Sequence, residues 1–310
     1  MLDAGLGGCR WDYPGQSVVG PPTRLPVFRT RTMMPEDCWM GALETNFLGW
    51  FSLSECSYMK PPPTCRADVC FRQEDLDPDM VSERYVVLVD VLRAASTAVT
   101  AFASGATEIR CFATVRGAVR AAGRLGRDLV ILCGERGGRR LPGFDVGNSP
   151  AEMTPEHVGG RVLVMTTTNC TRALVRLRGA RAVLLGAFLN RSAVAKYLDG
   201  RAGDVLLVCA GTHGVRSDDD VACAGAIAEL LERGGCELSL AAQESVRVWH
   251  RMRRAPVKFL LRTEGARPLL ACGLEADIPR CARRDRFGLV PRMVDARESW
   301  RFRPVAVPSG

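Results

Sequence analysis

The chain has 310 residues, of which 47% are hydrophobic and 25% are charged, and its formal net charge is +8. This composition is typical of a globular protein, and no apolar stretch approaches the ~18 residues of a transmembrane helix. The N-terminus lacks the basic start and apolar core of a signal peptide, so we expect a cytoplasmic protein without a membrane partner.

The positive charge comes almost entirely from arginine. Only three lysines accompany 39 arginines, and short basic clusters such as 251–254 contain no interleaved aromatic residues. A solvated, arginine-rich surface explains this pattern better than a nucleic-acid-binding face. We therefore expect no nucleic-acid partner, whereas a small anionic substrate and a homodimeric assembly are both compatible with the sequence.

The 13 cysteines form no Cys-x-x-Cys pair, and most of them lie inside apolar runs. Free cysteine behaves as a small hydrophobic residue in such positions, and zinc-ligand spacing is absent. The pattern predicts reduced core thiols in a reducing compartment.

Residues 1–63 differ from the rest of the chain, because they contain eight of the 18 prolines and show no sustained periodicity. We interpret them as a poorly ordered N-terminal extension, or as sequence upstream of a later start at Met34 or Met59.

From about residue 64, apolar runs alternate with helical patterns. Strands are predicted at 84–91, 107–113, 128–134, 161–167, 182–188 and 204–211. Helices are predicted at 96–105, 115–126, 171–179, 191–200, 219–235, 240–252 and 256–263, and an edge strand at 288–295. Continuously apolar strands are typical of sheets buried on both faces. The fold class predicted for residues 64–300 is therefore α/β, a three-layer α/β/α domain with a largely parallel or mixed sheet, followed by a tail at 301–310.

Short polar side chains follow several of these strands, where ligands bind in open α/β sheets. The turn 166–171 precedes a helix and could cradle phosphate, although ordinary helix capping would explain one such turn alone. Several turns of this kind favour a ligand site. The candidate phosphate-binding residues are Ser96, Thr97, Thr167, Thr168, Asn169, Thr171 and Asn190.

Four carboxylates fall in the same predicted region. Glu135, Asp145 and Asp220 are candidate ligands of Mg²⁺, and Asp90 is either a further ligand or the base that prepares water. Arg93 and Arg136 would supply forked donors to anionic oxygens.

Three nearby residues that could also act in the site are better explained without a functional role. Asp218 and Asp219 read as helix-capping acids ahead of the helix predicted at 219–235. His213, in a glycine-rich loop, reads as incidental rather than as a general acid.

Motifs along residues 64–295 resemble those of the 2-phosphosulfolactate phosphatase family: VVLVDVLRAASTAV, GERGGRRLPGFDVGNSPAE, TTTNCTRAL, GAFLN, VCAGTHG and CGLEADIPRCARRDRFGLVP. The resemblance implies a Mg²⁺-dependent enzyme of coenzyme M and sulfolactate metabolism that hydrolyses (R)-2-phospho-3-sulfolactate to 3-sulfolactate and phosphate. It places the family's acids on the four carboxylates named above, and its arginines on Arg93 and Arg136. Ala95 and Cys170 depart from the family pattern, which usually has Thr and Gly there.

Three other functions are compatible with parts of this pattern. A phosphatase of another small phosphorylated acid would look similar. A haloacid-dehalogenase-type enzyme would use Asp90 as its nucleophile, but Leu92 stands where that class carries a second aspartate. A non-catalytic anion-binding module is disfavoured, because four carboxylates would repel the anion unless a metal intervened.

Overall fold

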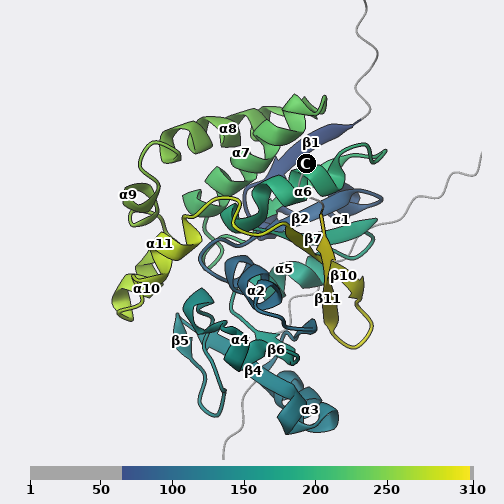
Figure 1. The fold of residues 1–310 in the computed structure, drawn as a ribbon. Coiled ribbons are helices and arrows are strands. Elements are labelled where there is room, and N and C mark those ends of the chain that lie inside the picture. The colour runs from purple at the N-terminus through teal and green to yellow at the C-terminus, as the bar shows by residue number, and fades with distance from the viewer. Residues whose placement is uncertain (1–64, 308–310) are drawn as a thin grey trace, which may run out of the picture. The chain divides into compact units, whose positions relative to one another are not determined.

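The computed structural model describes residues 65–307, so the predicted extension at 1–63 lies outside the described residues. The strands are β1 (Arg66–Cys70), β2 (Tyr85–Val89), β3 (Glu108–Cys111), β4 (Val130–Arg136), β5 (Arg139–Arg140), β6 (Val162–Thr166), β7 (Ala182–Gly186), β8 (Val205–Cys209), β9 (Glu237–Leu238), β10 (Leu289–Asp295) and β11 (Trp300–Ala306). Figure 1 shows their arrangement.

The α-helices are α1 (Pro78–Val81), α2 (Ala94–Ala103), α3 (Val115–Leu125), α4 (Pro155–Val158), α5 (Cys170–Arg176), α6 (Arg191–Leu198), α7 (Asp218–Arg233), α8 (Leu240–Met252), α9 (Pro256–Leu260), α10 (Ala266–Ala271) and α11 (Asp277–Cys281). Short 3₁₀ turns cover Gln73–Asp75, Arg127–Leu129, Pro150–Glu152 and Phe188–Asn190. Within residues 65–307, no helix has the length and apolar character needed to cross a membrane.

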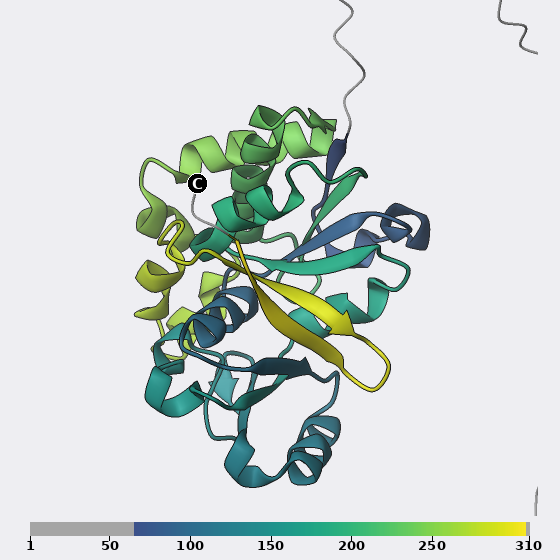
Figure 2. The ribbon, with the colours of Figure 1, turned by 45° about the vertical axis from the view of Figure 1, so that its right-hand side comes forward.

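The strands form one sheet in the order β5-β4-β6-β3-β11-β10-β7-β2-β8-β1-β9. Strands β4, β6 and β3 pair in parallel, and so do β7, β2, β8, β1 and β9. Between these two parallel blocks lies the antiparallel hairpin β10–β11, drawn in yellow in Figure 2. The pairings β3–β11, β11–β10 and β10–β7 are all antiparallel, so the two blocks run in opposite directions.

Alternate residues of each strand pack into different apolar layers, as the period of two requires. Val87 and Val89 of β2 pack with α6, α7 and α8 on one side of their block. Val86 and Leu88 face the central layer, which contains α2, α5 and the inner residues of the other block. Helix α3 covers that block's outer face. The α/β fold with a three-layer arrangement and a largely parallel, mixed sheet is confirmed.

The C-terminal hairpin corrects the sequence-based prediction. The strand expected at 288–295 is β10, but it lies between β11 and β7 and is not an edge strand. Residues 301–306, expected in a tail, belong to β11. Arginine and proline interrupt the apolar pattern of β11, and its fully buried aromatic residue is Phe302.

Cysteine usage also differs from the prediction. Cys65 and Cys236 form a disulfide that links the approach to β1 with the approach to β9. The two residues are 171 positions apart, so no local spacing reveals the pair. Of the other cysteines in the described residues, seven are buried free thiols, as expected, and Cys272 is partly exposed.

Helices α7 and α8 approach each other closely at Gly225, where a Cβ would lie 2.0 Å from the carbonyl oxygen of Ser245. We expect Gly225→Ala to lower the free energy of unfolding by about 3 kcal/mol, because the two helix backbones must separate. Urea denaturation measures this change. Gly123→Ala in α3 is the matched control, since no heavy atom lies within 4 Å of its Cβ position. It should raise stability by about 0.5–1 kcal/mol, and equal effects of both variants would contradict the packing argument.

Candidate functional site

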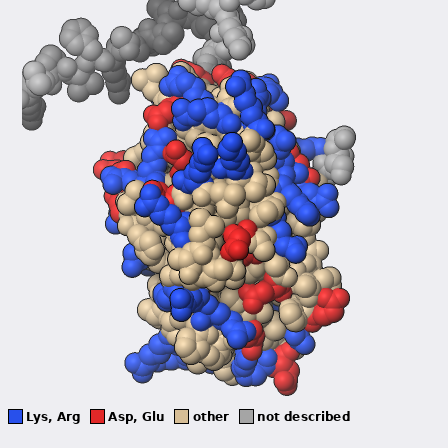
Figure 3. All heavy atoms as spheres, turned by 90° about the vertical axis from the view of Figure 1, so that its left-hand side faces the viewer, with Lys and Arg blue, Asp and Glu red and all other residues tan. Residues whose placement is uncertain are grey.

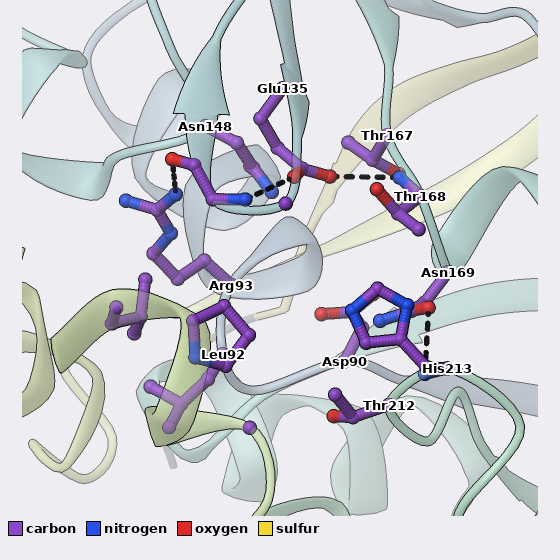
Figure 4. A pocket seen from close by; sticks show the side chains of 15 residues that line it. Asp90, Leu92, Arg93, Glu135, Asn148, Thr167, Thr168, Asn169, Thr212 and His213 are labelled. Atoms are coloured by element: carbon purple, nitrogen blue, oxygen red, sulfur yellow. Dashed lines mark hydrogen bonds between the residues drawn. The ribbon is translucent and has the colours of Figure 1, made fainter. Parts of the chain in front are cut away.

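A pocket lies where strand ends from both parallel blocks meet (Figure 4). Five neighbouring steps in the sheet separate β6 from β2, and a twist of about 20–25° per step turns the two blocks through roughly a right angle. The carboxyl ends of oppositely directed blocks can therefore converge. The lining residues are Asp90, Leu92, Arg93, Glu135, Gly137, Gly138, Asn148, Thr167, Thr168, Asn169, Thr212, His213, Gly265, Pro268 and Leu269.

Asp90 follows β2 directly and is 5% exposed. Its Oδ1 accepts a hydrogen bond from the N–H of Ala94 at 2.9 Å, and its Oδ2 accepts none from the described residues. Burial raises the pKa of Asp90 to about 7, and the negative charges of Asp219 and Glu135 add to this effect. Asp90 therefore presents a free carboxylate oxygen in a setting that favours a nearby cation or a proton.

Glu135 lies near the end of β4 and joins two loops through main-chain hydrogen bonds. Its Oε1 accepts the N–H of Thr168 and its Oε2 accepts the N–H of Gly138, each at 2.8 Å. Gly137 and Gly138 have φ angles of +58° and +86°. This left-handed backbone suits glycine, and a side chain at Gly138 would also crowd the carbonyl oxygen of Pro268 at 3.2 Å.

Arg93 lies on the pocket wall (Figure 4), and its charge is paired with Asp277. Its Nη1 donates to Oδ2 of Asp277 at 2.7 Å, and its Nη2 donates to the carbonyl oxygen of Gly138 at 3.0 Å. Ser149 donates its hydroxyl to the other oxygen of Asp277 at 2.6 Å. Arg93 is thus brought to the site as predicted, with a buried partner that the sequence did not suggest.

Three oxygens at the pocket have no hydrogen-bond partner although they are buried. They are Oδ1 of Asn148 and the hydroxyls of Thr167 and Thr168. Buried polar atoms are nearly always paired in folded proteins, so oxygens of this kind gathered around one cavity favour a polar ligand there. Neutral oxygens beside the Asp90 carboxylate form a donor set that suits a hard cation.

The residues at this pocket fit Mg²⁺ better than zinc. Among residues 65–307, no three His, Cys, Asp or Glu side chains gather closely enough to hold a metal ion by themselves. Mg²⁺ commonly takes one or two carboxylates and completes its shell with water and phosphate oxygens. Asp90, Glu135 and the unpaired oxygen of Asn148 could supply such a partial shell.

The structure does not bring Asp145 to the pocket. Its carboxylate forms an ion pair with Arg127 at 2.7 Å and accepts the N–H of Leu132, and its side chain is 32% exposed. The pKa of Asp145 is lowered, because the Arg127 and Leu132 hydrogen bonds outweigh the effect of burial. The expectation that Asp145 binds the metal is therefore not supported by its position.

Asp220 lies close to the site, but its carboxylate is engaged by main-chain N–H groups. Its oxygens accept the N–H groups of Val91 and Gly211 at 2.8 and 3.0 Å, which links the ends of β2 and β8. Burial, followed by repulsion from Asp219 and Asp90, raises its pKa well above the usual range. Asp220 does not line the pocket, so we assign it a structural role in place of metal binding.

The remaining predicted residues divide into two groups. Thr167, Thr168 and Asn169 line the pocket, whereas five others do not: Ser96, Thr97, Arg136, Thr171 and Asn190. The side chains of Ser96, Thr171 and Asn190 are buried and bond to main-chain groups. Arg136 donates to the carbonyl oxygen of Glu135 and to the hydroxyl of Thr166.

Several residues of the site were missed or undervalued in the sequence. Asn148 reaches the pocket because Val146 forms a parallel bridge with Cys133, so the chain that follows it runs beside β4 toward the carboxyl end of that strand. Its place in the glycine-rich stretch 134–149 was the available signal. His213 lines the pocket with a left-handed φ of +52°, where it was expected to be incidental.

Asp277 lies in the motif CGLEADIPRCARRDRFGLVP, but the sequence did not indicate its pairing with Arg93, which is 184 residues away. Its part in the site follows only from the folded structure.

Comparisons with known proteins identify relatives of this chain. A family model described as 2-phosphosulpholactate phosphatase matches residues 70–296. A protein of Thermotoga petrophila named probable 2-phosphosulfolactate phosphatase is 36% identical over 212 residues, which cover 68% of this chain and 90% of the relative. Relatives with the same name from Gloeobacter violaceus and Clostridium acetobutylicum are 38% and 33% identical, over 71% and 73% of this chain and 93% and 97% of their own lengths.

The raised pKa of Asp90 predicts how stability depends on pH in metal-free protein. The folded-state pKa of about 7 exceeds the unfolded value of about 3.9, so the folded state binds more protons between these values. The free energy of unfolding should therefore fall as pH rises through this window, by at most about 4 kcal/mol. Urea denaturation at pH 5 and pH 8 should show Asp90→Asn stabilised relative to wild type at both pH values, and more strongly at pH 8, because the unfolded carboxyl is already ionised at pH 5. An equal difference at both pH values would contradict this.

Proposed function

The chain belongs to the 2-phosphosulfolactate phosphatase family, and from this we propose that it hydrolyses (R)-2-phospho-3-sulfolactate to 3-sulfolactate and phosphate. Placement in coenzyme M or sulfolactate metabolism, a cytoplasmic location and a homodimeric assembly are further parts of this proposal.

The observation that carries the proposal is the set of unpaired buried oxygens beside two pocket carboxylates. Asn148, Thr167 and Thr168 present these oxygens, and Asp90 and Glu135 line the same cavity. An organic phosphate would be repelled by this arrangement alone, since the Arg93 cation is balanced by Asp277. We therefore propose that Mg²⁺ binds here, with Asp90, Glu135 and Asn148 as the residues that hold it.

A bound Mg²⁺ would neutralise phosphate charge and lower the pKa of coordinated water. Asp90 has one carboxylate oxygen free, so it can bind the metal or accept a proton from the attacking water. The hydroxyls of Thr167 and Thr168 can donate to phosphate oxygens. Arg93 has N–H groups beyond the two that are engaged, and these can reach an anionic oxygen at the pocket wall.

The site geometry does not support the alternative in which Asp90 forms an aspartyl-phosphate intermediate. Leu92 lines the pocket where that class needs a second acid to protonate the leaving group. A non-catalytic anion-binding module also fits poorly, because the pocket contains two carboxylates and one paired arginine.

The function is tested by phosphate release from phosphosulfolactate with and without Mg²⁺. We expect Glu135→Gln to lower kcat/KM by about 100-fold or more, because the loss of one carboxylate oxygen frees a loop and removes a metal ligand. Asp145→Asn is the matched control and should retain activity, since Asp145 lies outside the pocket. Wild-type protein that releases no phosphate, or equal losses in both variants, would show the assignment to be wrong.

Two of the three unpaired threonine hydroxyls, those of Thr167 and Thr97, are similarly buried and allow function to be tested separately from stability. Thr167 lines the pocket, whereas Thr97 does not, and both hydroxyls lack partners. Thr167→Val should lower kcat/KM by roughly 10-fold or more, because it removes a donor to the substrate. Thr97→Val should keep activity and raise the unfolding free energy by about 1 kcal/mol, since it removes an unsatisfied buried group. Activity loss in Thr97→Val would instead restore its predicted binding role.

A further inference from the structure

Asp277 forms a buried ion pair at the edge of the pocket without lining it. Its side chain is 4% exposed and that of Arg93 is 3% exposed, and their atoms approach to 2.7 Å. Both of its oxygens are engaged, since Ser149 donates to the second one at 2.6 Å. Separating the two side chains would leave an uncompensated buried charge on each, so the pair should keep this geometry.

A continuous series of hydrogen bonds runs from Asp277 to the predicted metal residues. Asp277 accepts from Arg93, Arg93 donates to the carbonyl oxygen of Gly138, and the N–H of Gly138 donates to Glu135. Glu135 in turn accepts the N–H of Thr168, whose hydroxyl is one of the unpaired oxygens. Helix α11 is thereby connected to loops that follow β4 and β6.

We propose that Asp277 is a positioning residue that keeps Arg93 on the Gly138 turn and away from the pocket carboxylates. Without the Asp277 charge, Arg93 would be a buried cation whose nearest anions are on the pocket side. The positive charge of Arg93 already lowers the pKa of Asp90, although other effects outweigh it. Glu135 is linked to Arg93 through Gly138, which accepts from Arg93 and donates to Glu135. Arg93 would then compete with a metal ion for these carboxylates.

Hydrogen exchange of metal-free protein tests this proposal without relying on the proposed function. Asp277→Asn keeps the shape of the side chain and removes its charge. We expect amide exchange across residues 134–141 to become at least ~10-fold faster, because the Gly138 turn loses its anchor. Ser149→Ala, a milder change that removes one donor to Asp277, should give a smaller increase in the same segment.

Glu108 provides the matched control. It is also a buried acid, 5% exposed, and it pairs with Arg301 at 2.7 Å, but it does not line the pocket. Glu108→Gln should leave exchange in 134–141 unchanged. In an Arg93→Met background, Asp277→Asn should add no further increase there, because Asp277 acts through Arg93. Unchanged exchange in Asp277→Asn, or a full additional increase in the Arg93→Met background, would overturn the proposal.

Metal binding gives a second readout, which rests on the proposed function. Calorimetry with MgCl₂ alone should show ~10–100-fold weaker binding to Asp277→Asn than to wild type. Without metal, Asp277→Asn should bind orthophosphate as tightly as wild type or more tightly, since its pocket is less negative. General damage to the fold would instead weaken the binding of both Mg²⁺ and orthophosphate. Wild-type affinity for Mg²⁺ in the variant would contradict the competition by Arg93. If wild type itself binds no Mg²⁺, the metal assignment fails, and hydrogen exchange still decides the role of Asp277.

Discussion

The pocket depends on the two main-chain hydrogen bonds that Glu135 accepts. One comes from Thr168 in the loop after β6, and the other comes from Gly138 in the turn after β4. A single carboxylate therefore fixes two segments that no strand pairing connects beyond Thr166. Arg93 donates to the carbonyl oxygen of Gly138 in this turn, so the position of Glu135 also fixes where Arg93 stands on the pocket wall. The left-handed glycines are needed because only that backbone brings the Gly138 N–H back to its own strand end.

The negative charge beneath this pocket is poorly compensated inside the protein. Burial raises the pKa values of Asp90, Asp219 and Asp220, and repulsion adds to the effect, from Asp219 at Asp90 and Asp220 and from Asp218 at Asp219. Asp220 has two backbone donors and Asp219 has the Ser217 hydroxyl, whereas Asp90 accepts only the Ala94 N–H. A cation bound at Asp90 would offset part of this charge. On the outer surface shown in Figure 3, basic groups are spread among neutral and acidic ones.

The sequence predicted a largely parallel sheet between helical layers, because continuously apolar strands need cover on both faces, but it did not predict the two oppositely directed blocks. It also predicted Asp90, Glu135 and the Thr167–Asn169 turn at the pocket, since these residues directly follow or end buried strands. The position of Arg136 was predictable but missed: it is adjacent to Glu135 in β4, and neighbouring side chains of a strand point to opposite faces. Asp145 and Asp277 could not be placed, because their partners Arg127 and Arg93 are fixed by loop geometry and tertiary contact rather than by periodicity.

Cys170 shows how a departure from the family pattern can leave the site intact. A glycine at this position would be required only if the backbone were left-handed, but Cys170 is the first residue of α5 and is not among the residues with positive φ. Its side chain is 2% exposed and packs in the apolar layer with α2 and the central strand faces. Burial raises the pKa of the thiol well above its usual range, so it remains protonated and acts as a small hydrophobic group. Cys170 does not line the pocket, so the pocket keeps its oxygen donors without a reactive sulfur among them.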